Sequence, residues 1–259
     1  MKMNETTRRV IGFPDKYAAF RHQVSLFMNV PGLVGLWTAN HLDTSGNWYD
    51  WTQNALTLTR TGAPHHTYSG MAHYFSFDGV NDYFTRADEA ATSITGGEGY
   101  IDTPYRGLTL GCWFSSTDMT AFQGLVTKFA DVPNISYYLA FNGIGAGDPI
   151  RFRISDDGTN TDDVSSSNSV TASKWQFAVG RFSDYDAGEE LAVFLNGVKT
   201  TDTTARAAIY DGTAAFEVGS GQGGLYKLTG RMAIAFLSRV AVPDDMIGAL
   251  FQQSRALYG

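Results

Sequence analysis

The chain has 259 residues, of which 43% are hydrophobic and 14% are aromatic, and this composition excludes an intrinsically disordered protein. Its formal net charge of −7 opposes binding to phosphate backbones, so nucleic acid is not expected as a partner. The single cysteine, Cys112, excludes an intrachain disulfide bond. The chain lacks any apolar run of about 18 residues, so no membrane-spanning helix and no membrane partner are expected.

The N-terminal segment is expected to be an arm followed by a short helix. Residues 1–12 are polar and carry the cations Lys2, Arg8 and Arg9, without the apolar run that marks a secretory signal peptide. Apolar residues then recur at steps of three and four after Pro14, which predicts an amphipathic helix over residues 14–28.

From residue 33 onward, the chain consists of short apolar runs separated by turn residues. Strands are expected at residues 33–38, 56–60, 73–77, 82–86, 108–115, 123–129, 136–142, 150–155, 175–182, 190–195, 214–218 and 231–239. The polar stretch 156–169 is expected to be a surface loop, and the last apolar face predicts a helix over residues 244–258.

Two local patterns make the strand assignment specific. Leu108, Leu110, Cys112 and Phe114 alternate with other residues and therefore share one face of a strand. Asn196-Gly197, between two apolar runs, is the strongest hairpin signal in the chain. Many short strands without strand–helix–strand alternation predict two stacked antiparallel sheets. We expect residues 13–259 to form a single domain.

Several motifs in a fixed order resemble one family. They are KYAAFRHQVSLFMNVPGLVGLWTAN, YFSFDGVNDYFTR, LTLGCWF, KWQFAVGRF, LAVFLNGVK and LTGRMAIAFLSRVAVPDDMIGALF. Together they resemble the laminin-G-like domains of the concanavalin-A-like lectin/glucanase superfamily that occur in bacterial and phage proteins. The resemblance covers about residues 17–258 and implies an all-β jelly-roll sandwich with a short helix near each terminus. This fold hosts lectins, adhesion modules, hydrolases and structural proteins, so the resemblance alone leaves function open.

Catalysis is not expected. The hydrolases of this fold place two glutamates on one strand, where a period of two puts both carboxyls on the same face. No such pair occurs in the sequence, and Glu217 is the one glutamate inside a clear strand. The protein is therefore expected not to be an enzyme.

The resemblance raises the question of a bound Ca²⁺, which many relatives hold at one edge of the sandwich. The candidate ligands are Asp43, Asn47 and Asp50, which follow the first strand. The closing strand carries Ala233 and Ala235 where relatives commonly carry an aspartate, which removes an oxygen ligand that Ca²⁺ needs. We therefore expect no cofactor, with Ca²⁺ as the alternative and ordinary turn chemistry as the simplest role for these three residues.

An aromatic cluster provides a candidate carbohydrate site. Trp48, Tyr49 and Trp51 lie in a polar segment, and exposed aromatic rings can stack on the C–H faces of sugars. The favoured interpretation is that Trp48 and Trp51 instead fill the end of the sandwich, because large aromatic side chains dominate protein cores.

Two functional hypotheses remain. In the first, the protein is a phage structural or decoration protein on the virion surface, because laminin-G-like sandwiches work outside cells and no signal peptide is seen. The arm with Lys2, Arg8 and Arg9 would then dock on other virion subunits or on further copies of the chain. The alternative is an extracellular or cell-surface module that binds carbohydrate, with a host glycan as its partner.

Overall fold

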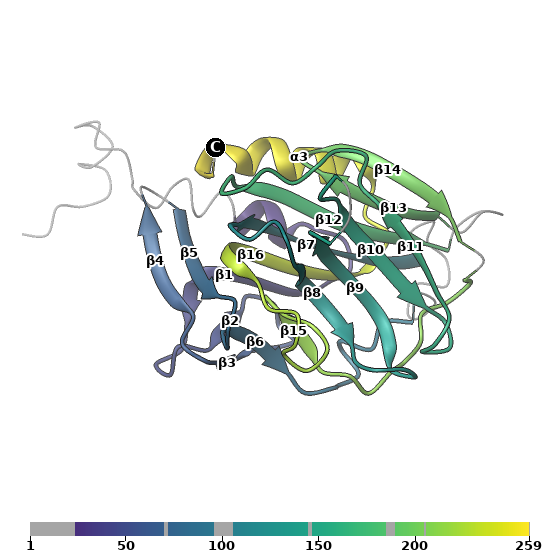
Figure 1. Ribbon diagram of the computed structural model, residues 1–259, viewed down its shortest axis with the longest axis horizontal. Coiled ribbons are helices and arrows are strands. Elements are labelled where there is room, and N and C mark those ends of the chain that lie inside the picture. The colour runs from purple at the N-terminus through teal and green to yellow at the C-terminus, as the bar shows by residue number, and fades with distance from the viewer. Residues whose placement is uncertain are drawn as a thin grey trace, which may run out of the picture.

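The computed structural model describes residues 24–69, 72–95, 106–144, 147–184, 190–204 and 206–258. In these ranges the chain forms two antiparallel sheets that stack face to face (Figure 1). The predicted all-β, jelly-roll sandwich is thus confirmed.

Nine of the described strands form one sheet. Its main order is β14 (Val198–Thr203), β13 (Glu190–Leu195), β12 (Gln176–Ser183), β7 (Arg106–Ser116), β16 (Thr229–Val240), β1 (Leu33–Leu42) and β2 (Trp48–Asp50). Beside this order, β5 (Ala72–Asp78) pairs with β16, and β4 (His65–Ser69) pairs with β5.

Seven described strands form the other sheet. Their order is β11 (Thr161–Ser165), β10 (Ile150–Ser155), β9 (Ile135–Asn142), β8 (Phe122–Phe129), β15 (Phe216–Val218), β6 (Tyr83–Arg86) and β3 (Thr59–Thr61).

The main core lies between the two sheets. Leu108, Leu110, Cys112 and Phe114 of β7 are all fully buried in it, which confirms the face predicted from their alternation. Burial raises the pKa of the Cys112 thiol, so this side chain stays neutral and packs as a small apolar group. From the seven-stranded sheet the core receives, among others, Leu125, Leu139, Phe141 and Phe152.

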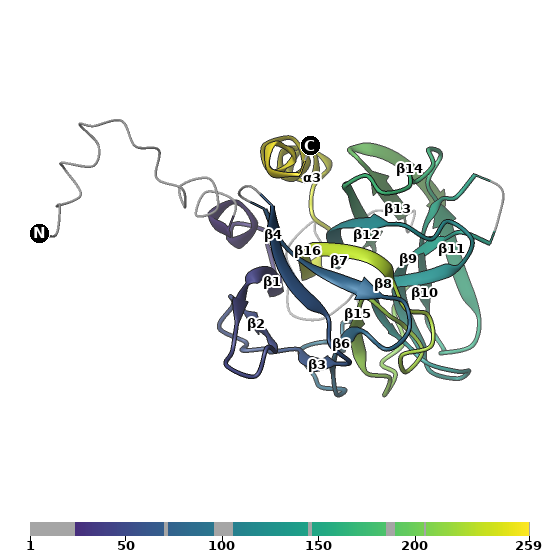
Figure 2. The same cartoon turned by 60° about the vertical axis from the view of Figure 1, so that its left-hand side comes forward.

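A second apolar layer covers the other face of the nine-stranded sheet. The chain ends there in α3 (Asp244–Ser254) and the short 3₁₀ helix η1 (Arg255–Leu257), and residues 24–28 form a helical turn against the same layer (Figure 2). The Trp113 indole nitrogen donates a hydrogen bond of 2.8 Å to the Ser254 hydroxyl. The helix predicted at the C-terminus is confirmed, whereas residues 14–23 of the N-terminal helix lie outside the described residues.

The Asn196-Gly197 hairpin forms as predicted. Both residues have positive φ angles, 55° and 80°, as the two central positions of a type I′ turn require. Leu195 and Val198 pair on either side of the turn, so β13 and β14 continue directly from it.

The loop predicted over residues 156–169 is wrong in part, because β11 occupies its middle. β11 pairs with β10 in antiparallel register, with Asp163 opposite Arg153. The strand is an edge strand of the sheet, and its outward positions are polar because they face solvent. A polar edge strand has the composition of a loop, which explains the error.

Candidate functional site

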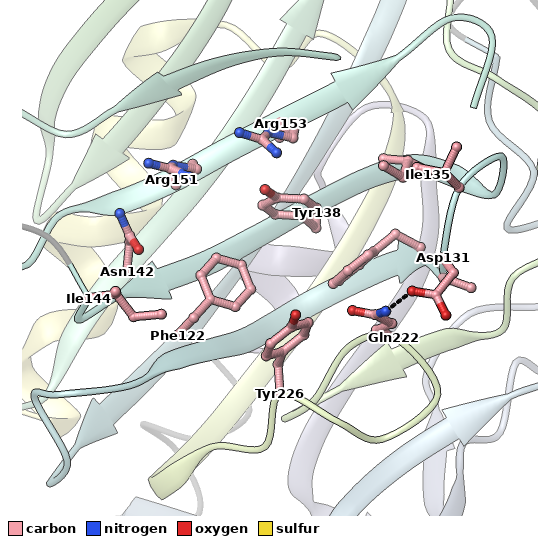
Figure 3. A pocket seen from close by; sticks show the side chains of 13 residues that line it. Phe122, Asp131, Ile135, Tyr138, Asn142, Ile144, Arg151, Arg153, Gln222 and Tyr226 are labelled. Carbon is pink, nitrogen blue, oxygen red and sulfur yellow. Dashed lines mark hydrogen bonds between the residues drawn. The ribbon is translucent and has the colours of Figure 1, made fainter. Parts of the chain in front are cut away.

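A groove of about 660 Å³ lies on the outer face of the seven-stranded sheet (Figure 3). Strands β8, β9 and β10 form its floor, and β10, at one side of the three, is called the β10 wall below. The segments 130–132 and 222–226 contribute residues to its rim. Its volume falls within the range of about 300–1,000 Å³ that is typical of small-ligand pockets.

Strand alternation explains which side chains reach this groove. In β10, Ile150, Phe152 and Ile154 point into the core, so Arg151 and Arg153 point to the outer face, where they line the groove. In β9, Tyr138 lines the groove while its neighbours Tyr137 and Leu139 lie in the core. Each of these two strands therefore contributes side chains to the core from one face and to the groove from the other.

Four aromatic rings form the apolar part of the groove. Phe122 meets Tyr226 edge to face, with ring centroids 5.0 Å apart at 80°, and it meets Tyr138 at 5.7 Å and 87°. Phe129 lies 4.8 Å from Tyr138 and 6.1 Å from Tyr226. Tyr138 and Phe129 are buried, whereas Tyr226 is 36% exposed. Tyr226 is thus the ring most available to a ligand.

The β10 wall of the groove is charged. The Arg153 Nη2 donates a hydrogen bond of 2.7 Å to Asp163 Oδ1, and the Arg151 Nε lies 3.4 Å from Asp163 Oδ2. The Arg153 guanidinium also lies 5.4 Å from the centroid of the Tyr138 ring, within range of a cation–π interaction. Burial raises the pKa of Tyr138, with the two arginines acting in the opposite direction, so its phenol stays protonated at neutral pH.

The glycine-rich segment 219–227 forms the opposite wall. The side chains of Gln222 and Asp131 are hydrogen-bonded across this end of the groove (Figure 3). The segment lies directly on the Phe129 ring, since a Cβ at Gly221 would be only 2.4 Å from it. Glycine is therefore required at position 221 for this close approach.

Glu217 fixes the position of segment 219–227 through hydrogen bonds. It is buried in β15, and its Oε2 accepts hydrogen bonds of 2.6 Å from the Ser220 hydroxyl and 3.2 Å from the Gly224 amide. Burial raises the pKa of the Glu217 carboxyl, and these hydrogen bonds partly offset the effect. Glu217 thus positions the loop that carries Gln222 and Tyr226.

Glu217→Gln should change how stability depends on pH. A carboxyl whose pKa is raised by folding contributes stability that is present below its unfolded pKa and is lost as pH rises through its folded pKa. We therefore expect wild type to lose stability relative to Glu217→Gln over a pH range that starts at about 4.3, the ordinary pKa of a glutamate, and extends through the raised pKa of the folded protein. Urea unfolding of both proteins across this range measures the difference, and a constant difference at every pH would contradict this role.

The three residues of the predicted aromatic platform do not share one surface. Trp48 is 0% exposed and packs against Phe75 and Phe84, with centroids 5.0 Å away in each case. Its ring is therefore inaccessible to a sugar. Tyr49, its neighbour in β2, faces the other way and is 42% exposed.

Trp51 belongs to a small cluster near the exposed Tyr49. Its ring stacks on His41 with centroids 4.0 Å apart, and its indole nitrogen donates a 2.7 Å hydrogen bond to the Thr38 hydroxyl. Tyr49 lies 5.2 Å from the same histidine. Any platform at this edge therefore consists of Tyr49, His41 and Trp51, without Trp48.

The oxygen atoms of the predicted metal ligands already accept hydrogen bonds from other groups of the protein. Asp43 Oδ1 accepts hydrogen bonds from the amides of Ser45 and Asn47, and its Oδ2 accepts one from the Asn47 side chain. The Asn47 side-chain oxygen accepts one from the Arg60 amide. This is ordinary turn chemistry, the simplest of the roles expected for these residues.

Asp50 plays a different structural role. It is 5% exposed and accepts hydrogen bonds from the amides of Leu36, Thr52 and Leu56 and from the Thr52 hydroxyl. Among the described residues, no group of three or more histidine, cysteine, aspartate or glutamate side chains is arranged to hold a metal ion. The arrangement around Asp43, Asn47 and Asp50 does not fit Ca²⁺, which needs free oxygen ligands.

The predicted assembly residues Lys2, Arg8 and Arg9 lie outside the described residues. In the part of the chain that the structure describes, no helix has both the length and the apolar character needed to cross a membrane.

The groove itself was missed at the sequence level, although two signals for it exist. The run IRFRIS alternates strictly, which places Arg151 and Arg153 together on the face away from the core. The run SYYLAFN has adjacent tyrosines, one of which must leave the core. Neither signal indicates that the two strands are neighbours or that Tyr226 folds over them.

Solved structures with the same fold include several binding domains. The binding domain of paraclostridial mosquitocidal protein 1 is similar at 11% identity with a TM-score of 0.63, over 85% of this chain and 52% of that chain. The botulinum neurotoxin serotype G binding domain is similar at 9% identity with a TM-score of 0.61, over 85% and 50%. This chain thus spans about half the length of these toxin domains.

A third similar structure matches over its full length. Domain 4 of AbnA, an extracellular arabinanase of Geobacillus stearothermophilus, is 13% identical with a TM-score of 0.58, over 86% of this chain and 100% of that domain. At such identities the likeness establishes the fold alone.

Sequence comparison identifies the family. No curated protein sequence matches the chain. The family model for the concanavalin A-like lectin/glucanases superfamily, of laminin-G type, matches residues 78–245, more than half of the chain. This range includes β7 to β15, and with them every strand that forms the groove floor. The chain therefore belongs to the concanavalin A-like lectin/glucanases superfamily.

Proposed function

We propose that the protein is a non-catalytic carbohydrate-binding module that holds a glycan in the groove on its seven-stranded sheet. The observation that carries this proposal is the groove itself, in which aromatic rings and hydrogen-bonding side chains converge on one solvent-facing surface. Sugars present apolar C–H faces and polar hydroxyl edges, and this surface matches both.

The geometry suggests how a sugar ring would be held. Phe122 and Tyr226 form a corner at 80°, so one ring can stack on a sugar face while the other packs against its edge. Asn142 and the Gln222–Asp131 pair lie around the rings and can exchange hydrogen bonds with hydroxyl groups (Figure 3).

The carboxylates support a binding role over a hydrolytic one. Glycoside hydrolysis generally needs two carboxyl groups that flank the scissile bond. Asp131 is the one carboxylate among the described residues that line the groove, and it is hydrogen-bonded to Gln222. Glu217 is buried beneath the loop and engaged with Ser220 and Gly224.

Similar structures add support for the alternative that the sequence left open. The arabinanase domain was solved with arabinotriose. The botulinum neurotoxin DC binding domain was solved with SialylT and, separately, with rat synaptotagmin II. These examples support a binding module outside the cell, with a glycan as the first partner class to test. None of the comparisons reported above supports the virion hypothesis, and its arm lies outside the described residues.

Tyr226→Ala should weaken glycan binding by about tenfold or more, because aromatic contact surface is lost from the most exposed ring of the groove. A glycan array on the purified protein identifies ligands, and titration calorimetry with the strongest of them measures the loss. Tyr68→Ala is the matched control, since Tyr68 is 69% exposed on β4, outside the groove.

The same measurement separates the two candidate surfaces. Tyr49→Ala should leave affinity unchanged if the groove is the site. A loss with Tyr49→Ala but not with Tyr226→Ala would move the site to the edge near β2. Absence of binding to every glycan on the array would refute the proposed function.

A further inference from the structure

We infer that the glycan held in this groove carries a carboxylate, as uronic and sialic acids do, and that this group binds at Arg151 and Arg153. The inference rests on the proposed function and specifies its ligand class. It starts from the charges on the β10 wall, which the aromatic part of the groove does not explain.

The two arginines share a single carboxylate. Asp163 lies 2.7 Å from Arg153 Nη2 and 3.4 Å from Arg151 Nε. One negative charge thus faces two positive charges, and the wall keeps a net positive charge in a protein whose formal net charge is −7. This local excess of positive charge attracts an anionic group on a ligand, and it does not repel the uncharged parts of a sugar.

Both guanidinium groups also retain unused hydrogen-bonding capacity. Each carries five N–H donors, and the contact with Asp163 involves one nitrogen of each group, Nε of Arg151 and Nη2 of Arg153. The two side chains are 28% and 25% exposed, so some of their surface is open to the groove. A planar carboxylate fits the fork of a guanidinium through two parallel hydrogen bonds.

The neighbouring strand places polar groups beside these donors. Arg153 lies opposite Tyr138, and Arg151 lies opposite Ala140, two residues before Asn142 on the same strand face. The phenol of Tyr138 and the amide of Asn142 are therefore at the same end of the groove as the arginines (Figure 3). They can bind the ring oxygen or hydroxyls next to the carboxylate.

The opposite wall would orient the sugar. Asp131 lies on the other side of Tyr138 from Arg151 in Figure 3, where it repels a carboxylate and accepts hydrogen bonds from hydroxyls. An acidic sugar would therefore place its charged group toward β10 and its hydroxyl edge toward Asp131.

The test compares glycans that differ only in their acid group. Oligogalacturonate is measured against its carboxyl-reduced form, sialylated glycans against their sialic acid methyl esters, and sulfated against unsulfated glycans. For the carboxylated pairs we expect wild type to favour the acid by about tenfold or more, the effect of one charge-assisted pair of hydrogen bonds. Added salt should reduce this preference without changing the affinity for the neutral form.

Variants locate the effect. Arg151→Gln/Arg153→Gln/Asp163→Asn removes both cations without leaving Asp163 unpaired, and it should abolish the preference for the acidic over the neutral form. Asp163→Asn alone should strengthen the preference, because both arginines lose the carboxylate that they share. Arg206→Gln is the charge-matched control, because Arg206 pairs with Asp156 and Asp162 outside the groove lining. Melting curves confirm that each variant is folded.

The outcomes distinguish the inference from the proposed function. Equal binding of acidic and neutral partners, with a loss on Tyr226→Ala, would overturn the inference and leave the proposed function intact. A preference for sulfate over carboxylate would overturn the assignment of the acid group. An acid preference that survives the triple variant would place the contact elsewhere, and no glycan binding at all would refute both.

Discussion

Replacing Asp50 with alanine should lower the free energy of unfolding by about 3–5 kcal/mol, because the change leaves several buried donors without acceptors. The carboxylate accepts from the amides of Leu36, Thr52 and Leu56 at 2.9 to 3.0 Å and from the Thr52 hydroxyl at 2.6 Å. It joins β1 to the segment after β2 at a site that is 5% exposed, where water cannot easily replace it. Urea unfolding of wild type and variant measures the effect.

Asp43→Ala is the matched control for this prediction. Asp43 also accepts hydrogen bonds from the amides of Ser45 and Asn47, but it lies in a surface turn where water can replace the lost acceptor. We expect its substitution to cost much less than that of Asp50. Equal losses would contradict the role of burial, and a large drop in wild-type melting temperature on adding a chelator would instead indicate a metal at these residues.

Lys128→Ala should lower the free energy of unfolding by about 3–5 kcal/mol, because it combines the loss of a buried charge pair with a cavity. Lys128 is 0% exposed. Its Nζ lies 2.6 Å from Asp88 Oδ1 and donates to the carbonyls of Gly212 and Ala214 at 2.7 and 2.8 Å. One ammonium group thus ties β8 to two distant loops. Thermal and urea unfolding measure the loss.

Two further variants separate charge from packing at this position. Lys128→Met keeps most of the volume and should cost less than alanine, because no large cavity forms. Lys199→Ala removes a lysine that pairs with Glu190 and Asp244 at the surface, and it should cost less than about 1 kcal/mol. If Lys199→Ala proved as costly as Lys128→Ala, the importance assigned to burial would be wrong.

The contacts of Lys128 also affect the shape of the groove. Phe129, the next residue, lines the groove while Lys128 points to the opposite side of the same strand. A register shift lies between these two residues where β8 pairs with β9. The hydrogen bonds of Lys128 therefore help to fix the end of β8 at which the Phe129 ring meets Tyr138.

The sequence by itself determined the fold class and the two faces of most strands. Alternation in β7 and the order of short apolar runs predicted a two-sheet sandwich, because a strand with one apolar face must pack that face against another layer. The Asn196-Gly197 turn was equally predictable, since positive φ at both positions favours these residues. Such local rules act within a few residues and can be read from the chain.

Only the tertiary structure decided the candidate site and its supports. Tyr226 meets Phe122 across 104 positions of chain, and Lys128 reaches carbonyls at 212 and 214. Trp48 and Tyr49 are adjacent in sequence, yet one is buried and the other exposed. Local patterns indicate which residues share a strand face, but strand order and loop packing determine which face meets solvent and which side chains converge there. The groove depends on those long-range pairings, and its residues therefore come together only in the folded chain.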